Sequence, residues 1–375
     1  MGERSQAQPG GTVVVVPTVR EQQIRAFLDA WREELAGADD ILVLEDNPAP
    51  TFALETALPV THLSWADIDR DLGDLAWIVP RRTDCVRSYG FWRAWRSQPA
   101  MIVTLDDDCR PLQPGFLAAH RDALDAPGAD PAWESTTEPL RPRGFPYHEH
   151  TRRWRCVINH GLWRGIPDYD AVTQLAQQRT PTACRARQQT VPVGRYFPLC
   201  GMNVAFRPEL TPALYFLLMG RSHGVDRFGD IWTGVFAKRI CDHLGHAVRS
   251  GEPEIVHARA SNVWTNLRKE AAGLERNETL WQIVDGAVLT ETTVAGCYRQ
   301  LADEIAAAPD RDDGLPPGYL RRLGQAMALW CDLFAGPVVP RPQSVPVTAP
   351  SPTGATAAGP ARSRDRGADP ARDRL

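Results

Sequence analysis

Short apolar runs alternate with amphipathic segments in the first part of the chain, and this alternation restricts the fold more than any other feature. Val13–Val16, Ile41–Leu44 and Ala76–Val79 have the length and composition of buried strands. The helices expected between and after them are Glu21–Leu35, a segment that Ser64 can cap and that runs to Leu72, and Asp84–Trp95. Strands that alternate with helices through short links predict an α/β protein, with a mostly parallel sheet and helices on both faces.

Three consecutive aspartates end the next apolar run. Ala100–Leu105 reads as a buried strand, and Asp106, Asp107 and Asp108 follow it. Because side chains alternate along a strand, Asp106 and Asp108 should point in one direction and Asp107 in the other. A solvated acidic turn is one interpretation. Since the carboxyl ends of strands form the ligand-binding edge of an open α/β sheet, we favour a divalent ion held by these carboxylates, with a diphosphate completing its shell.

The first strand lacks the glycine-rich loop that usually grips phosphates in α/β nucleotide folds. Val16 is followed by Pro-Thr-Val-Arg, which contains neither GxGxxG nor GxxxxGK[ST]. A diphosphate would therefore need another source of positive charge, and a metal on the acidic strand end supplies one.

Composition excludes several classes of protein. The formal net charge is −4 over 375 residues and the isoelectric point is near 6.2, so the whole chain has no attraction to nucleic acid or membrane surfaces. No apolar stretch approaches the ~18 residues needed to cross a bilayer. The eight cysteines are scattered without a CxxC pair, and no signal peptide is recognisable. These features predict free thiols in a cytoplasmic protein, with no nucleic acid partner and no membrane insertion.

The middle of the chain, residues 111–198, is rich in proline, glycine, arginine and aromatic residues. Arg141–Tyr147 and Asn159–Asp170 are expected to form neither a regular helix nor a central strand. Long aromatic-rich loops with neighbouring carboxylates suit an acceptor site for a sugar, whereas packing is the simpler role for any single ring.

Regular structure is expected again after this region. The expected elements are a strand over Phe197–Phe206 with a kink at Gly201, an amphipathic helix that starts at Asp230, a strand over Glu254–His257, and C-terminal helices over Thr290–Ala307 and Pro317–Phe334. We predict a disordered N-terminus over 1–10, one catalytic domain over 11–336 and a disordered Pro/Ala/Arg-rich tail over 337–375.

Several short blocks within roughly residues 12–275 occur in an order that identifies a family. The blocks are Val16–Arg20, Thr104–Cys109, His160–Trp163, Ile166–Ala171, Pro198–Asn203 and Ile240–Gly245. With them the chain resembles the reversibly glycosylated polypeptides, the UDP-arabinopyranose mutases best known from plants.

The resemblance implies a fold, a substrate and a reaction. The implied fold is glycosyltransferase-A-like, and the implied substrate is a UDP-sugar bound with Mn²⁺ or Mg²⁺. The implied reaction interconverts UDP-L-arabinopyranose and UDP-L-arabinofuranose, with reversible self-glycosylation on an arginine. Association with a second copy or a related subunit is also implied.

The matching blocks imply roles for particular residues. Asp106, Asp108 and His257 would hold the metal, and Arg143 would be the glycosylated arginine. The residues expected to bind the substrate are Pro17, Thr18, Arg20, Glu45, Asp46, Arg87, Asp107, His160, Trp163 and Asn203.

Arg143 needs help to act as a nucleophile, because a guanidinium stays protonated and has no free acceptor lone pair. The carboxylates that could act as a base beside it are Asp168, Asp170 and Asp230. The alternative role for Arg143 is neutralisation of phosphate.

Two positions depart from the family pattern. Gly229-Asp230 stands where related chains usually have two adjacent acids, which leaves the identity of the base open. The second strand ends in Glu45-Asp46-Asn47-Pro48 in place of Asp-Gly-Asp-Pro, so either Glu45 or Asp46 could hold the uridine.

Two other functions use the same residues. One is a metal-dependent glycosyltransferase that transfers from a UDP-sugar to itself or to an external acceptor. The other is a non-catalytic subunit that binds a nucleotide sugar within a mutase complex.

Overall fold

A computed structural model describes residues 10–336, except positions 136, 138–141, 149, 167, 177–187 and 258–261. The strands are β1 (Thr12–Thr18), β2 (Asp40–Glu45), β3 (Val60–Leu63), β4 (Met101–Leu105), β5 (Cys109–Pro111), β6 (Gly128–Pro131), β7 (Thr151–Gly165), β8 (Gln189–Thr190), β9 (Asn203–Phe206) and β10 (His246–His257). They form one sheet in the order β3-β2-β1-β4-β9-β7-β10-β5, with β6 beside β7 and β8 beside β10.

The sheet is mixed but mostly parallel along this path. Neighbours from β3 through β2 and β1 to β4 are parallel, and β7 is parallel to β10. Strand β9 runs antiparallel to both β4 and β7, and β5 runs antiparallel to β10. This arrangement confirms the predicted α/β class with a mostly parallel sheet.

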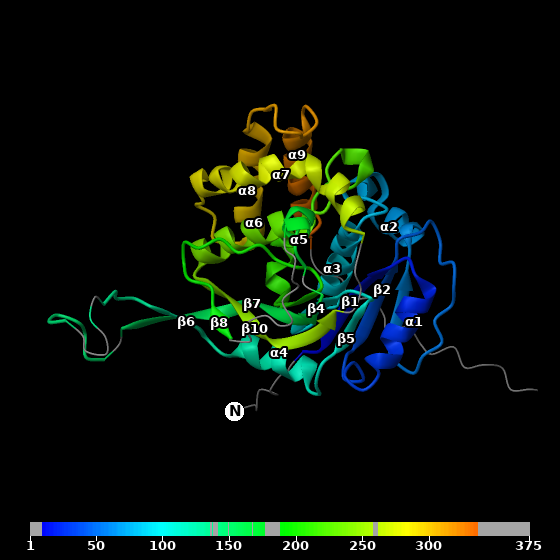
Figure 1. Cartoon of the computed structure of the whole chain (residues 1–375), viewed down its shortest axis with the longest axis horizontal. Coiled ribbons are helices and arrows are strands. Elements are labelled where there is room, and N and C mark those ends of the chain that lie inside the picture. The colour runs from blue at the N-terminus through cyan, green and yellow to red at the C-terminus, as the bar shows by residue number, and fades with distance from the viewer. Residues whose placement is uncertain are drawn as a thin grey trace, which may run out of the picture. The chain divides into compact units, whose positions relative to one another are not determined.

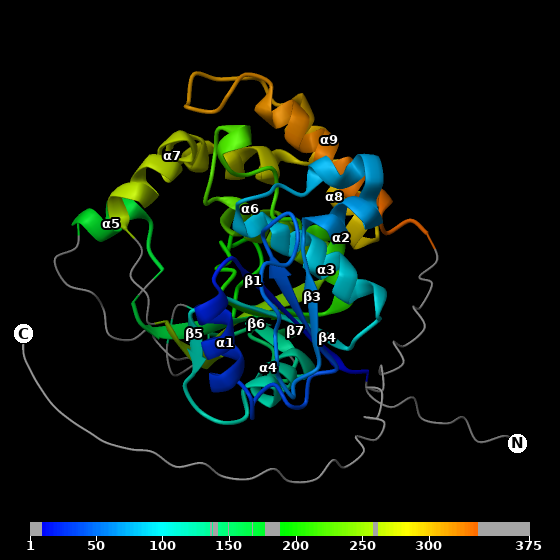
Figure 2. The same ribbon diagram turned by 90° about the vertical axis from the view of Figure 1, so that its right-hand side faces the viewer.

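Helices cover both faces of the sheet (Figures 1 and 2). The α-helices are α1 (Glu21–Ala30), α2 (Trp65–Leu72), α3 (Arg87–Arg96), α4 (Phe116–Asp125), α5 (Ala171–Ala176), α6 (Gly229–Leu244), α7 (Val263–Gly286), α8 (Val294–Ala307) and α9 (Tyr319–Asp332). The 3₁₀ turns are η1 (Gly73–Ile78), η2 (Asp84–Val86), η3 (Pro208–Ala213) and η4 (Arg221–His223).

Strand β1 shows how the sequence builds two cores. Its valines alternate between the faces of the sheet, as strand geometry requires. Val13 and Val15 join the core formed with α3, α6, α8 and α9, whereas Val14 and Val16 join the core formed with α1 and α4. A continuous run of valines is therefore explained by burial on both faces.

Several expected elements are confirmed with shifted ends. The first helix ends at Ala30 rather than Leu35, and the helix expected from Asp84 divides into the 3₁₀ turn η2 and helix α3. Ser64 caps α2 through a capping box with Asp67, as its position predicted.

The strand predicted over Ala76–Val79 is wrong. This run lies in the 3₁₀ turn η1, and the strand that completes the parallel half of the sheet is β3. A short apolar run is compatible with either structure, and here its apolar side chains pack against the helical core.

The prediction that Asn159–Asp170 lacks a central strand is also wrong. Strand β7 extends to Gly165 and lies between β9 and β10. Two polar side chains, Asn159 and His160, are buried within it because partners meet them inside the protein: the Asn159 amide donates to His120 Nδ1 at 2.9 Å, and His160 Nδ1 lies 3.1 Å from Ser250 Oγ. Part of the middle region that was expected to be loop is therefore strand.

The segment that follows β10 in the sequence was not predicted to be a helix. Helix α7 spans Val263–Gly286, and the side chain of Asn262 caps it by accepting from the Thr265 amide at 3.0 Å. Its apolar periodicity is interrupted by charged and small residues, several of them buried, so the local pattern is weak.

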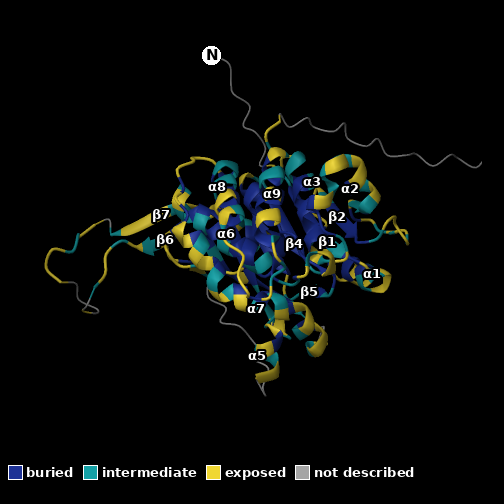
Figure 3. Ribbon diagram, turned by 90° about the horizontal axis from the view of Figure 1, so that it is seen from above, coloured by how far each residue is buried: buried dark blue, intermediate teal, exposed yellow. Residues whose placement is uncertain are grey.

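Strands β6 and β7 form an arm that projects from the rest of the sheet (Figure 1). The outer part of this arm is largely exposed (Figure 3). The tails predicted to be disordered lie, apart from Gly10, outside the described residues, so they stay predictions, as does the single catalytic domain over 11–336. None of the helices described is both long and apolar enough to cross a membrane.

Candidate active site

The aspartates after β4 lie at the carboxyl edge of the parallel strands. The Asp106 carbonyl accepts from the Cys109 amide at 3.1 Å, which turns the chain into β5. Strand β5 then pairs with the end of β10 so that Cys109 lies opposite His257. This register is the reason that His257 reaches Asp108.

His257 is oriented for a metal. Its Nδ1 donates to the Ile166 carbonyl at 2.7 Å, so the tautomer that can bind a metal presents Nε2, which lies 3.9 Å from Asp108 Oδ1. Two ligands of one divalent ion, each about 2.1 Å from it, lie about 3.0–4.2 Å apart. The tautomer and the spacing therefore fit a shared divalent cation.

The three aspartates have different partners. Asp107 is buried and faces β1, where it accepts from Thr18 Oγ1 at 2.6 Å and forms an ion pair with Arg20. Arg20 also lies 3.3 Å from Asp108 Oδ2. Burial raises the pKa of Asp107 despite these donors. Asp107 therefore connects the acidic motif to the end of β1 through its contacts with Thr18 and Arg20.

Asp106 pairs with Arg87, the first residue of α3. Arg87 is buried, and its Nη1 donates to Thr104 Oγ1 at 2.5 Å and to the Gly201 carbonyl at 2.6 Å, while Nη2 contacts Asp106 Oδ1. Burial opposes the charge of Arg87, but the carboxylates of Asp106 and Asp84 outweigh it, and the net pKa of the guanidinium is raised. The arginine expected near the nucleotide thus holds the acidic motif in place.

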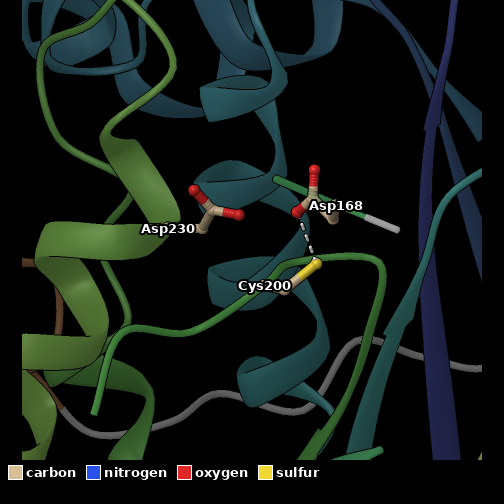
Figure 4. Close-up of side chains that lie close together, drawn as sticks. All are labelled: Asp168, Cys200 and Asp230. Atoms are coloured by element: carbon tan, nitrogen blue, oxygen red, sulfur yellow. Dashed lines mark hydrogen bonds between the residues drawn. The ribbon is translucent and has the colours of Figure 1, made fainter. Parts of the chain in front are cut away.

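A second carboxylate pair lies nearby (Figure 4). Asp168 comes from the loop after β7, Cys200 from the loop before β9, and Asp230 from the first turn of α6, and their ligand atoms all lie within 4.8 Å of one another. The Cys200 thiol donates to Asp168 Oδ2 at 2.9 Å, and the Gly201 amide donates to Asp230 Oδ2 at 2.9 Å. The tertiary structure thus joins two of the three candidate bases.

This pair is suited to holding a proton. Burial raises the pKa of Asp230 to about 7, and the charges of Asp84 and Asp168 add to the effect. Burial and the two neighbouring carboxylates raise the pKa of the Cys200 thiol well above its usual range. Although these three side chains are close enough to hold a metal ion together, a protonated thiol is a poor ligand, so we interpret them as a proton-sharing cluster.

The third candidate base, Asp170, contacts the first turn of α5. Its carboxylate caps α5 by accepting from the Thr173 amide at 2.8 Å and from Thr173 Oγ1 at 2.6 Å. Asp170 is exposed, and its described contacts are with α5 rather than with Asp168 or Asp230.

The two acids that end β2 are both buried. Glu45 accepts from Thr51 and Asn47 and lies 2.9 Å from His62 Nε2. Asp46 accepts from Trp65 Nε1 at 2.7 Å, and burial raises its pKa. Pro17, in β1, pairs with Leu44 of β2 and so lies beside them.

The residues of the middle blocks that were expected to bind the substrate lie in two strands, His160 and Trp163 in β7 and Asn203 in β9. His160 is in edge-to-face contact with Trp163, and burial lowers the pKa of His160 to about 4. Asn203 is buried, accepts from His120 Nε2 at 3.0 Å, and donates to the carbonyls of Leu162 and Pro253. Its amide is thus engaged in holding β7, β9 and β10 together.

Arg143 lies apart from these residues. It occupies an exposed turn in the connection between β6 and β7, at the outer part of the arm. The described part of the chain contains no contact between Arg143 and the aspartates at the strand ends.

Packing around the start of α6 explains why position 229 is a glycine. A Cβ at this position would lie 2.6 Å from the Phe216 carbonyl oxygen and 3.1 Å from Cys85 Sγ. The start of α6 therefore has no room for an acidic side chain at position 229.

Sequence reasoning missed Glu270 and Arg227, which contact each other beside the carboxylate pair. Glu270 of α7 is buried and accepts from Arg227 Nε at 2.8 Å and from the Ala171 amide at 2.7 Å. No local pattern identifies such a residue, because its importance arises from segments that are distant in the sequence.

The fold and these side chains define an α/β protein with a histidine–aspartate pair at the ends of two strands. A carboxylate pair, formed by a loop and the start of α6, lies near it. The family model described as "Reversibly glycosylated polypeptide" matches residues 10–336, and the chain belongs to this family.

Among similar proteins, "UDP-arabinopyranose mutase 1" of Arabidopsis thaliana is 33% identical over 336 residues, which cover 86% of this chain and 91% of that protein. "UDP-arabinopyranose mutase 1" of Oryza sativa subsp. japonica is 31% identical over 336 residues, covering 86% and 89%.

Solved structures are more remote. Glucosyl-3-phosphoglycerate synthase from Mycobacterium tuberculosis, in complex with phosphoglyceric acid, has a TM-score of 0.36 and 15% identity over 82% of this chain and 81% of that chain. A mannosyltransferase from Pyrobaculum calidifontis, in complex with GDP-Man and Mn²⁺, has a TM-score of 0.35 and 14% identity over 86% and 70%. Likeness at these scores is too remote to support a functional argument.

Proposed function

We propose that this protein is a UDP-sugar mutase that interconverts UDP-L-arabinopyranose and UDP-L-arabinofuranose. The relatives named UDP-arabinopyranose mutase support this reaction. The observation that carries the proposal is the position of the Asp108–His257 pair and the Asp168–Asp230 pair, which Asp106, Arg87 and Gly201 connect.

Asp106, Asp108 and His257 would hold Mn²⁺ or Mg²⁺, since carboxylate oxygens and an imidazole nitrogen suit these ions. When bound, the metal would neutralise the charge that develops on the β-phosphate as the bond from C1 to oxygen breaks. Arg20, beside Asp108, is placed to add positive charge at the same edge. Arg87 would hold Asp106 in orientation.

Asp230 would move the proton that ring contraction requires. To reclose as a furanose, the sugar must lose a proton from one hydroxyl while its former ring oxygen gains one, and C1 then recaptures UDP. No net proton is consumed, so a carboxyl group that titrates near neutral pH suits both transfers. The pKa of Asp230, about 7, supports this role, with Asp168 as its neighbour.

A metal-dependent transferase is the second candidate, and one observation favours it. Arg143 is exposed on the arm formed by β6 and β7, where it could accept a sugar from a site on another molecule. Self-glycosylation on Arg143 belongs to the mutase proposal as well, because a glycosylated intermediate could return the sugar to UDP.

The proposal places the protein in a reducing compartment, the cytoplasm. The seven cysteines of the described residues are all free, which supports this placement.

Product analysis tests the proposed function. Purified protein is incubated with UDP-L-arabinopyranose and Mn²⁺, and the nucleotide sugars are resolved by chromatography. A UDP-furanose product is expected. Release of free UDP or labelled protein alone would favour the transferase, and an unchanged substrate that still binds would favour a non-catalytic subunit.

A mixing experiment tests Arg143 separately. Asp108→Asn keeps the acceptor arginine but loses a metal ligand, whereas Arg143→Lys keeps the metal site but loses the acceptor. Neither variant alone should incorporate labelled sugar. Label on the Asp108→Asn chain after mixing would show transfer between molecules, and label on Arg143→Lys alone would exclude Arg143 as the acceptor.

A further inference from the structure

Glu270 connects two segments that are far apart in the sequence. It lies on α7 with its side chain buried, and both carboxylate oxygens are engaged. Oε1 accepts from Arg227 Nε at 2.8 Å, and Oε2 accepts from the Ala171 amide at 2.7 Å.

Each donor is close in the sequence to one member of the carboxylate pair. Ala171 begins α5, three residues after Asp168, and Arg227 lies three residues before Asp230. Glu270 is thus bonded to both segments that bring Asp168 and Asp230 together.

Both segments need such a restraint. When Asp168 and Asp230 are both ionised, their repulsion favours separation of the two segments. Arg227 has a φ of 69°, in the left-handed region that residues with a Cβ avoid, so its conformation must be held by contacts such as that with Glu270.

We propose that Glu270 is a positioning residue that sets the distance between Asp168 and Asp230. The inference rests on the proposed function for the catalytic meaning of this pair, whereas the positioning itself can be measured without any substrate. A purely structural ion pair would contribute to stability and leave the pair unchanged.

Cys200 reports the position of Asp168 directly. Its thiol donates to Asp168 Oδ2, and the Asp168 carboxylate is one of the groups that raise the pKa of the thiol. If Asp168 moves away, the thiolate fraction rises about tenfold for each unit by which the pKa falls, and alkylation accelerates with it.

The test measures alkylation of Cys200 by iodoacetamide in the full-length protein, followed by peptide mass spectrometry. Glu270→Gln keeps the size of the side chain but replaces one acceptor oxygen by a donor. The expected result is an increase in the Cys200 rate of about tenfold, equal to that in Asp168→Asn, with no further increase in the double variant. The matched control is Glu275→Gln, on the exposed side of the same helix, for which no change is expected.

A second variant covers the case in which Glu270→Gln does not fold. Arg227→Gly removes one donor to Glu270 and fits the left-handed backbone, so folding should be retained. It should also accelerate alkylation of Cys200. An unchanged rate in a folded Glu270→Gln or Arg227→Gly protein, or additive effects of Glu270→Gln and Asp168→Asn, would overturn the proposal.

Activity supplies a second measurement. Glu270→Gln should lower kcat and change KM by a smaller factor. It should also move the apparent pKa of the pH–rate profile downward, because the charge of Asp168 would lie farther from Asp230. A KM effect alone with an unchanged profile would contradict the positioning role. If the wild-type protein has no mutase activity, the proposed function fails while the Cys200 rates still decide the inference.

Discussion

Arg87 and Asp230 contact the backbone of the same residue. The Gly201 carbonyl accepts from Arg87 Nη1 at 2.6 Å, and the Gly201 amide donates to Asp230 Oδ2 at 2.9 Å. Because Arg87 also pairs with Asp106, a continuous set of contacts joins the acidic motif at the end of β4 to the first turn of α6. Asp106, proposed to hold the metal, and Asp230, proposed to move a proton, are therefore linked through Arg87 and Gly201.

Removal of one metal ligand should abolish metal-dependent turnover. Asp108→Asn is expected to lower kcat by about 10²–10³-fold, because a Lewis acid contributes several kcal/mol to transition-state stabilisation. Mn²⁺ affinity, measured by electron paramagnetic resonance, should fall in parallel while the circular dichroism spectrum stays unchanged. Asp122→Asn, on the exposed side of α4, is the control, and full activity of Asp108→Asn would rule out the metal assignment.

Loss of the buried guanidinium should destabilise the fold. Arg87→Met leaves Asp106 without its ion pair and the Gly201 carbonyl without its donor, at a cost of about 2–4 kcal/mol in the free energy of unfolding. Asp106 can recover part of its hydration, because its side chain is 34% exposed.

Urea denaturation measures this change against a surface ion pair. Arg32→Met breaks the exposed pair with Asp29 and should cost less than about 1 kcal/mol. Equal losses in the two variants would mean that the Arg87 contacts add nothing to stability.

The proton on Asp230 predicts a pH dependence of stability. Its pKa is about 7 in the folded protein, compared with 3.8 for an ordinary aspartate, so between these values the folded state holds a proton that the unfolded chain has lost. This contribution is complete below about pH 4 and is lost as the pH rises through 7. Asp230→Asn should therefore raise Tm relative to wild type at pH 8 and leave it unchanged at pH 4.

Comparison of the two proteins at each pH is necessary because histidines whose pKa burial lowers act in the opposite direction. Burial lowers the pKa of His120 to about 3 and that of His160 to about 4, so their contributions to stability grow as the pH rises. These contributions cancel in the difference between variant and wild type. A Tm difference that does not vary with pH would contradict the raised pKa of Asp230.

The start of α6 should not tolerate a side chain at Gly229. Gly229→Ala places a Cβ 2.6 Å from the Phe216 carbonyl oxygen and should cost about 1–3 kcal/mol. Gly286→Ala, at the end of α7 with no heavy atom within 4 Å, should be neutral or stabilising by about 0.5–1 kcal/mol. Differential scanning calorimetry of both variants checks the contrast, and a Gly229→Ala protein as stable as wild type would show that this turn can rearrange.

Local patterns predicted much of the framework. The strands β1, β2 and β4, the capped helix α2 and the helix starting at Gly229-Asp230 follow from apolar periodicity and capping residues within each segment. The same reasoning failed at Ala76–Val79 and in β7, where the apolar pattern was short or was interrupted by polar residues with distant partners. Helix α7 was missed for a related reason, since part of its buried face is charged or small.

The sequence by itself determined the strands β1, β2 and β4, the aspartates at a strand end and the family to which the chain belongs. Only the tertiary structure decided how the site is completed. The pairing of β5 with β10 brings His257 to Asp108, the approach of two loops and α6 forms the Asp168–Asp230 pair, and α7 supplies Glu270. Strand and helix patterns arise from neighbours along the chain, whereas these contacts depend on register and packing between distant segments, which no local pattern encodes.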